Sequence, residues 1–523
     1  MTESIAASKK MLGRQWVVLA MLGVVVLLVR LPSLDLPFSN DGGAQAYHAR
    51  LIVQGEPLYS THHTGHHLPG VYYTYALAFW LFGDSTWSVK LMIFLWVLGT
   101  VYVIYALGNL IAGMGVGALA AVFYALLSAQ VFLMGPSAEM ELLANLPRTA
   151  AILIILQLAL QQFGGQYQIG LWWRLMLVGI LSGIAFLFKA IYLSSLVIVG
   201  CVLLMHLWQN RTMPGIWRRT IAYGLWVALG FSLVLVSVAL YFIGLGLWPR
   251  LVLVFTIGQE YVSHRNANAR SDYAALLFPV FALIRANVLL LILGLMAMMM
   301  YALSKGKRST GLLYIIIWFA LSYAETMVTR VFFTHYYLLI LPPLSLLAGW
   351  MSIKIYGDLK RGQPAKLPVA PVILAVVVGL SSLLSIGQDF DYYVSYLKYK
   401  LGQGTYEDFI VSGYPVTSLN TIRTEKLAAY LQARTTDQDY IYYWSGYTEL
   451  YYLANRRCPV DIIWPIYAGA TGSYQRIFNP QTRYVILGES NNIPRPDWLY
   501  EEVARAYTLE TIIDEQEVYR RLD

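Results

Sequence analysis

Long apolar runs separated by short polar segments fill the first three quarters of this chain. Runs of about 20 apolar residues are long enough to cross a bilayer as helices. A backbone in lipid must satisfy its polar groups within the segment, so helices are the expected spanning structure. The pattern predicts about eleven transmembrane helices, over residues 15–31, 87–110, 114–134, 142–162, 171–188, 190–209, 219–244, 275–303, 311–328, 332–351 and 368–387.

The pattern changes at about residue 388, where the apolar runs stop and charged residues return. Alternating apolar positions predict strands over Tyr440–Trp444, Val460–Trp464 and Tyr484–Leu487. Helical spacing predicts helices over Thr421–Ala433, Thr448–Ala454 and Trp498–Ala506. We therefore predict a transmembrane domain over 1–387, with a first outer loop over 32–86, and a small α/β domain over 388–523.

Composition and charge agree with a polytopic α-helical membrane protein. Hydrophobic residues make up 58% of the chain and charged residues 13%, against roughly 25% charged in soluble domains. Residues 388–523 hold 13 Lys and Arg and 18 Asp and Glu, so the net positive charge lies in the transmembrane part. Basic residues gather in loops on one side, which predicts a cytoplasmic N-terminus and an extracytoplasmic C-terminal domain. The charge is thus a sign of topology and does not indicate nucleic-acid binding. No Asn-x-Ser/Thr sequence lies on the predicted outer side, which favours the plasma membrane of a prokaryote.

The first outer loop is unusually polar. It holds Asp41, Arg50 and five of the eight histidines. Polar chemistry at the mouth of a membrane bundle indicates a functional site. Asp41, followed by two glycines, has the chemistry of a general base that accepts a proton from a hydroxyl nucleophile. It is equally suited to cap a helix over 44–54, because Asp is a favoured N-cap residue.

The run HHTGHH, residues 62–67, suggests two interpretations. One is a metal site, although adjacent histidines point apart in an extended segment. The other, which we favour, is a set of loop histidines that donate hydrogen bonds or bind phosphate. We assign no metal ligands and require no cofactor, and a divalent metal stays open.

Other charged residues lie at the predicted outer ends of the spans. Glu139 and Glu141 precede one span, where acidic residues also complement the helix dipole. Lys189 is the lone charge of an apolar stretch and could equally snorkel to the interface. Arg330 and His335 flank a late span. One candidate base among several cations suits group transfer from a lipid phosphate, since cations bind phosphate and stabilise it as a leaving group.

These residues resemble bacterial polyprenyl-phosphate-dependent glycosyltransferases of the protein O-mannosyltransferase type, which have the C-type membrane fold. The family's first outer loop has an Asp-Glu pair, an Ala-Arg pair, and then Gly…Leu-Tyr and Lys-Pro-Pro…Tyr-Tyr segments. The matching positions are Asp41, Ala49-Arg50, Gly55, Leu58-Tyr59 and Pro69–Tyr73. Further matches follow in order, in AEMELLANLP with Glu141, GIAFLFK with Lys189, RVFFTHYYLLILPPLSLLAG from Arg330, and IYYWSGYTELYYLANRRCP. The likeness covers nearly the whole chain.

The resemblance implies a function. It predicts transfer of a monosaccharide from a polyprenyl-phosphate donor to a hydroxyl acceptor on protein, lipid or glycan, with Asp41 as general base and inversion at the sugar. The residues predicted to bind the donor phosphate or substrate are Lys189, Arg330, His67, His66, Glu141, Tyr47, Arg50, His335 and Tyr336. The alternatives are a transporter of lipid or small solute, and a non-catalytic relative of the glycosyltransferases.

Two positions depart from the family pattern. The second acid of the usual pair is Gly42, and the lysine of Lys-Pro-Pro is His67. A histidine titrates near neutrality. If His67 contacts phosphate, we expect activity to fall as the pH rises past the pKa of His67.

Overall fold

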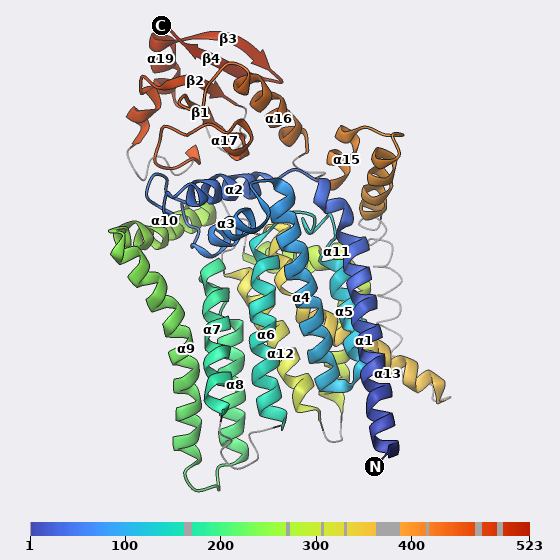
Figure 1. Cartoon of the computed structure of the whole chain (residues 1–523). Helices are drawn as coiled ribbons and strands as arrows, with labels where there is room; N and C mark the ends of the chain where they lie inside the picture. The colour runs from blue at the N-terminus through green and yellow to red at the C-terminus, as the bar shows by residue number, and fades with distance from the viewer. Residues whose placement is uncertain are drawn as a thin grey trace.

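A computed structural model describes residues 2–161, 170–267, 272–304, 308–328, 332–361, 387–414, 418–465, 473–488 and 495–522. A helical bundle forms the body of the protein, and a small domain with a β-sheet lies at one end of it (Figure 1). The N-terminus lies at the opposite end of the bundle (Figure 1). The bundle helices are α1 (Thr2–Arg30), α4 (Thr86–Ala112), α5 (Met114–Leu127), α6 (Met140–Gln161), α7 (Leu171–Phe188), α8 (Ser194–Gln209), α9 (Ile216–Gly244), α11 (Asp272–Leu303), α12 (Thr310–Met327) and α13 (Leu341–Lys360).

These helices confirm a multi-pass α-helical membrane fold. Among the described residues, α1, α4, α6, α7, α9 and α12 contain stretches long and apolar enough to cross a membrane, and α5, α8 and part of α11 are shorter apolar helices. Helices α7 and α9 approach closely at Gly179 and Gly230, where an added Cβ would lie 2.0 Å from a backbone oxygen of the facing helix. Small residues allow such close packing between membrane helices.

Three predicted spans differ from the structure or lie beyond it. The span over 332–351 is a 3-10 helix, η2 (Thr334–Leu339), followed by α13, which runs on to Lys360. Pro342 and Pro343 explain the break, because proline starts an α-helix readily but cannot continue one. The span over 114–134 ends at Leu127, where the chain enters turns that lead to α6. The span over 368–387 lies almost wholly outside the described residues.

A layer of helices separates the bundle from the sheet domain (Figure 1). The first loop supplies η1 (Leu31–Asp35), α2 (Asn40–Val53) and α3 (Gly70–Phe82). Helix α10 (Trp248–Ala267) lies between the predicted spans 219–244 and 275–303, in a part of the chain with no predicted helix. The first loop is therefore a folded platform between the bundle and the C-terminal part of the chain.

The C-terminal part is a four-stranded sheet with helices. Its elements are a helical segment over 387–400, α15 (Tyr406–Gly413), α16 (Ser418–Gln432), β1 (Tyr440–Trp444), α17 (Glu449–Ala454), η4 (Ser473–Phe478), β2 (Thr482–Leu487), α19 (Asp497–Ala506), β3 (Tyr507–Ile513) and β4 (Gln516–Arg521). The strand order is β1-β2-β4-β3, with β1 and β2 parallel and the other pairs antiparallel. The small α/β layer is confirmed, together with the predicted strands at β1 and β2 and the three predicted helices.

One predicted strand is wrong, and two strands were not predicted. Val460–Trp464 is not a strand, and Ile462 forms only an isolated bridge with His63 of the first loop. This segment is apolar because it packs against another part of the chain rather than within the sheet. The hairpin of β3 and β4 completes the sheet in its place.

Candidate functional site

Asp41 lies in the first turn of α2, and Ser39 caps that helix. Ser39 Oγ accepts a hydrogen bond from Gly42 N at 3.3 Å. The interpretation of Asp41 as the N-cap is therefore wrong. Because Ser39 satisfies the helix end, the Asp41 carboxylate is left to interact with other charged groups.

Glu139 and Glu141 lie at the start of α6, after a turn-rich segment that is held from three sides. Gly135 is needed in this segment, because an added Cβ would lie 2.5 Å from Ser128 O. The donors come from α1, α4 and α3, so the first loop and two bundle helices fix the acids in place. The contacts are Arg30 Nη1 to Gly135 O at 2.5 Å, Lys90 Nζ to Pro136 O at 2.9 Å, and Tyr75 Oη to Ala138 O at 2.8 Å.

Lys189 ends α7, and its ammonium group faces Glu141 and Tyr336. Lys189 Nζ lies 3.9 Å from Glu141 Oε1 and 3.7 Å from the centroid of the Tyr336 ring. Tyr192 Oη donates to the same Glu141 oxygen at 2.5 Å. Lys189 therefore belongs to a polar cluster rather than extending alone toward water.

The structure thus brings together six polar side chains from four separate parts of the sequence. They interact at the end of the bundle that faces the C-terminal domain. We call this set the acidic cluster: Asp41, Glu139, Glu141, Lys189, His335 and Tyr336.

Burial and mutual repulsion change the acidity of this cluster. Burial raises the pKa of Asp41, the positive charges of His335 and Lys189 oppose this rise, and the charge of Glu141 adds to it. Burial, with the charges of Asp41 and Glu141, raises the pKa of Glu139 well above its usual range. A carboxylate with a raised pKa is a stronger base, so burial makes Asp41 better suited to accept a proton.

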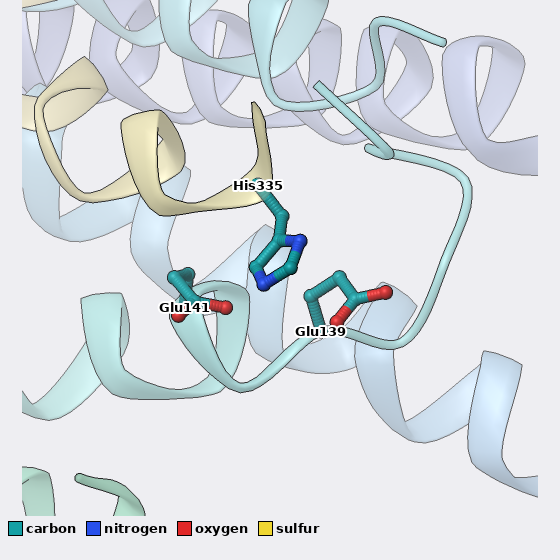
Figure 2. A group of neighbouring side chains, drawn as sticks. All are labelled: Glu139, Glu141 and His335. Carbon is teal, nitrogen blue, oxygen red and sulfur yellow. The ribbon is translucent and has the colours of Figure 1, made fainter. Parts of the chain in front are cut away.

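Three members of the cluster could hold a metal ion. Figure 2 shows the imidazole of His335 between the carboxyl groups of Glu139 and Glu141. One ligand atom from each residue lies within 4.8 Å of the other two, and all three residues are buried. Glu139 Oε1, Glu141 Oε2 and His335 Nδ1 have no hydrogen-bond partner among the described residues. Such buried polar atoms are costly, and two carboxylates with one imidazole fit a divalent cation.

The HHTGHH run, by contrast, is used for hydrogen bonds within the protein. His62 Nδ1 bonds Val460 O at 2.9 Å and Nε2 bonds Tyr47 Oη at 3.0 Å. Both nitrogens of His63 are also engaged, with Arg250 O at 2.7 Å and Gly65 N at 3.1 Å. The ring nitrogens of His62 and His63 are thus occupied by hydrogen bonds within the protein.

His67 interacts electrostatically with Lys189 of the acidic cluster, and its ring contacts that of His66. Their ring centroids are 4.2 Å apart, and His67 Nδ1 bonds Tyr72 Oη at 3.2 Å. Burial, and secondarily the charge of Lys189, lower the pKa of His67 to about 3. His67 is therefore neutral near pH 7, and the expectation that it titrates in that range is wrong.

A pH–rate profile of a His67→Asn variant tests this assignment. Because His67 is already neutral above its pKa of about 3, we expect the variant to keep the shape of the wild-type profile between pH 5 and 9. Activity should rise with pH in both proteins as Asp41, whose pKa is raised, loses its proton. A basic limb present only in the wild type would show that His67 binds substrate in its charged form.

Tyr47 and Arg50 lie on the side of α2 that contacts the C-terminal domain. Arg50 forms an ion pair with Asp84 at 2.5 Å, and Arg50 Nη1 donates to Tyr452 O at 2.8 Å. Tyr47 Oη accepts from Cys458 N at 3.2 Å. These contacts occupy both side chains in domain docking, so their predicted role in substrate binding is without support from the geometry. Arg330 lies outside the described residues.

Three buried residues of structural importance were not singled out from the sequence. Arg148 and Glu325 form an ion pair inside the bundle, and Glu449 of α17 packs on Gly43 of α2. Each follows or interrupts an apolar run, which is the signal that could have identified Arg148 and Glu325.

The chain matches no known protein family model, and no curated protein is similar in sequence. Solved structures, however, share its fold. ArnT from Cupriavidus metallidurans, bound to undecaprenyl phosphate, superposes with a TM-score of 0.62 at 15% identity, over 97% of this chain and 98% of that one. The apo form of the Archaeoglobus fulgidus oligosaccharyltransferase gives a TM-score of 0.50 at 13% identity, over 90% of this chain and 69% of that one. The C-type membrane glycosyltransferase fold is thereby confirmed.

Proposed function

From this fold, we propose that the chain transfers a monosaccharide from a polyprenyl-phosphate donor to a hydroxyl acceptor. The observation that carries the proposal is the acidic cluster, in which Lys189 Nζ lies 3.9 Å from Glu141 Oε1 and both charges act on the Asp41 carboxylate, whose pKa burial raises. The lipid phosphate bound to ArnT supports the same class of donor. We place the reaction on the extracytoplasmic face of a prokaryotic plasma membrane, as the charge distribution predicts.

In the proposed reaction, an Asp41 carboxylate oxygen accepts the proton of the acceptor hydroxyl. The resulting oxygen nucleophile attacks the anomeric carbon, and the bond from that carbon to the phosphate oxygen breaks with inversion. Polyprenyl phosphate leaves with the bonding electron pair. Lys189 stabilises the negative charge that grows on the leaving group. Tyr336 holds the ammonium group in place through the cation–π contact.

Glu139, Glu141 and His335 would hold a divalent cation in this proposal. Such an ion would supply positive charge to the donor phosphate. Without it, Glu141 and His335 still shape the site, because the charge of Glu141 raises the pKa of Asp41 and that of His335 lowers it.

Metal binding can be measured apart from transfer. We expect Mn²⁺ or Zn²⁺ to raise the melting temperature of the purified protein, since a ligand at 100 times its Kd stabilises by about 2.7 kcal/mol. Glu141→Gln should weaken cation binding at least tenfold by calorimetry, whereas Asp84→Asn, an acid paired with Arg50, should not. Equal binding by wild type and Glu141→Gln would exclude this site.

A transfer assay with a panel of radiolabelled polyprenyl-phosphate sugars tests the proposed function, run with and without chelator. Formation of a glycosylated acceptor with release of polyprenyl phosphate is the expected result. Solute or lipid transport into proteoliposomes without any glycosyl product would favour a transporter. Binding of the lipid without turnover for any sugar or acceptor would favour a non-catalytic relative.

A further inference from the structure

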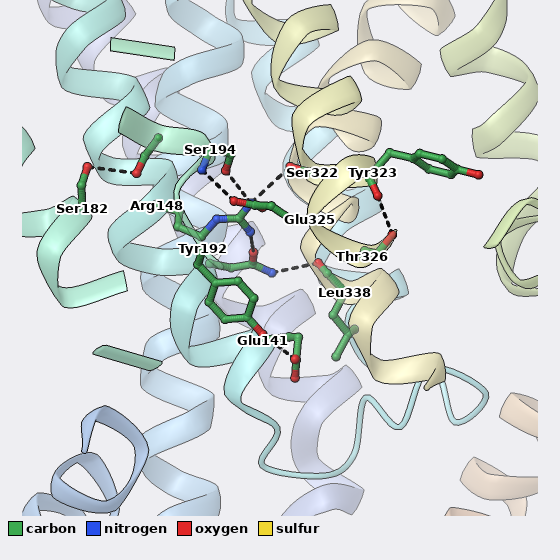
Figure 3. Close-up of polar contacts among 12 residues, drawn as sticks. Glu141, Arg148, Ser182, Tyr192, Ser194, Ser322, Tyr323, Glu325, Thr326 and Leu338 are labelled. Carbon is green, nitrogen blue, oxygen red and sulfur yellow. Dashed lines mark hydrogen bonds and ion pairs between the residues drawn. The ribbon is translucent and has the colours of Figure 1, made fainter. Parts of the chain in front are cut away.

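A buried charge pair lies one layer deeper in the bundle than the acidic cluster. Arg148 of α6 and Glu325 of α12 form an ion pair, and their side chains are 0% and 8% exposed. Figure 3 shows them between α6, α8 and α12. A charge among membrane helices is costly and marks function more often than stability.

The hydrogen bonds of this pair converge on the start of α8. Arg148 Nη2 donates to Ser194 Oγ at 2.7 Å and to Ser322 Oγ at 3.2 Å. The other oxygen of Glu325, Oε1, accepts from the backbone N of Ser194 at 2.6 Å. Both members of the ion pair therefore hold the same residue, Ser194.

Ser194 is joined by a short turn to Lys189. The turn is tight, with Tyr192 N donating to Lys189 O at 3.0 Å. Its other anchor is Tyr192 Oη, which donates to Glu141 at 2.5 Å (Figure 3). The turn that carries Lys189 is thus tied at one point to the acidic cluster and at the other to the Arg148–Glu325 pair.

The same helix face also sets the position of η2. Asn145 Oδ1 accepts from Arg148 Nη1 at 3.2 Å, and Asn145 Nδ2 donates to Leu338 O at 2.9 Å. Helix η2 supplies His335 and Tyr336, and the Tyr336 ring contacts the Lys189 ammonium group. Arg148 is therefore linked to that ammonium group in two ways, through the turn at Ser194 and through η2.

Stability alone does not explain the pair. Replacing a buried ion pair with apolar residues of similar volume is often neutral or stabilising, whereas removing one partner is strongly destabilising. Arg148 Nε, moreover, has no hydrogen-bond partner within the described part of the chain. The pair instead holds Ser194, and with it the turn from Lys189 to Ser194, in a fixed position.

We propose that Arg148 and Glu325 are positioning residues that hold the Lys189 ammonium group where it binds the donor phosphate. The inference rests on the proposed function, and it concerns the affinity for the phosphate rather than proton transfer by Asp41. Arg148 and Glu325 act through Lys189 and do not touch the substrate themselves.

The test is a double-mutant cycle read by binding of undecaprenyl phosphate, which requires no turnover. We expect Lys189→Ala and Glu325→Gln each to weaken binding at least tenfold, and Glu325→Gln to cause less than a further twofold loss in the Lys189→Ala protein. If the two losses of binding affinity multiply in the double variant, Glu325 acts independently of Lys189. That result would overturn the proposal. In a transfer assay, Glu325→Gln should raise the KM for the donor while the pH profile set by Asp41 keeps its shape.

Two further variants separate positioning from folding. Ser182→Ala removes a hydrogen bond from Ser195, 2.9 Å long and next to the network, and should change binding less than twofold. The double variant Arg148→Met/Glu325→Met removes both charges with little change in volume, and it should remain folded yet bind weakly. Wild-type affinity in this double variant would overturn the proposal. No binding of undecaprenyl phosphate by the wild type would instead count against the proposed function itself.

Discussion

Replacement of Asp41 by Asn is expected to reduce sugar transfer by a factor of about 10² to 10⁴, the usual contribution of a general base. The amide has nearly the shape of the carboxylate but cannot accept the proton of the acceptor hydroxyl. Ser39, not Asp41, caps α2, so the substitution should leave the helix intact. The measurement is the initial rate of transfer at saturating donor, together with the melting temperature of each protein.

Ser39→Ala is the matched control for the Asp41 variant. Loss of an N-cap hydrogen bond costs about 1 kcal/mol, so this variant should melt earlier while retaining most of its activity. The Asp41 variant should show the reverse pattern. Near-normal turnover by Asp41→Asn would refute the assignment of the base.

The pH dependence of the wild-type enzyme follows from the same carboxylate. Burial raises the pKa of Asp41, and only the deprotonated form can accept a proton. The rate should therefore fall as the pH drops through the raised pKa, above the usual range for aspartate. This limb should be absent from the residual activity of Asp41→Asn.

The sequence was sufficient to identify Asp41 but left two roles open for it. Both a cap and a base fit the segment SNDGG, since Ser39, Asn40 and Asp41 are all favoured caps. The structure excludes the cap, because α2 starts at Asn40 and Ser39 is its N-cap, and the role of base stays a prediction. The position of a helix end is uncertain by a residue or two from sequence alone. A shift of two residues decides whether Asp41 is the N-cap or lies inside the helix, so the sequence could not separate the two roles.

The C-terminal sheet shows where local patterns fail. The hairpin of β3 and β4 turns through Asp514 and Glu515, both at positive φ, 44° and 69°. Turns of this kind usually contain Asn-Gly or Asp-Gly, so Asp-Glu carried no recognisable signal. Val460–Trp464 gave the opposite error, because its apolar residues face a partner from the first loop that local sequence cannot reveal.

The buried charges illustrate a third limit. Arg148 follows Pro147 inside α6, and Glu325 lies close to the end of α12. The apolar runs that they interrupt mark both residues as candidates, but a charge near a helix end, such as Glu325, often reaches toward the membrane surface. That they face each other, and not the surface, depends on helix packing, which a single sequence does not specify.

Docking of the C-terminal domain should be abolished by Gly43→Ala. An added Cβ would lie 2.2 Å from Glu449 Cβ and 2.7 Å from Glu449 Cα, closer than atoms can approach. Because a backbone atom is involved, α17 must move away from α2 to relieve the clash. Overpacking of this kind costs about 1–3 kcal/mol, and here the cost falls on one interface.

Gly42→Ala provides a control one residue away. Its Cβ would meet Ser39 Oγ at 3.2 Å and Phe38 Cδ1 at 3.3 Å, which are side-chain atoms that can shift by the small amount required. We therefore expect Gly42→Ala to stay docked, although the glycosyltransferases that the sequence resembles carry an acid at this position. Limited proteolysis between the bundle and the sheet domain measures docking, and cleavage should speed up in Gly43→Ala alone.

Docking also bears on catalysis, because α2 carries both Gly43 and Asp41. Glu449 is buried against this helix, and burial raises its pKa to about 8, so it is a neutral acid at pH 7. Displacing α17 from α2 would expose this face to water and remove the burial that raises the pKa of Asp41. Gly43→Ala should accordingly lose transfer activity at least tenfold, with the acidic limb of its pH profile moved to lower pH. Full activity with rapid proteolysis would show instead that the sheet domain is not needed to form the site.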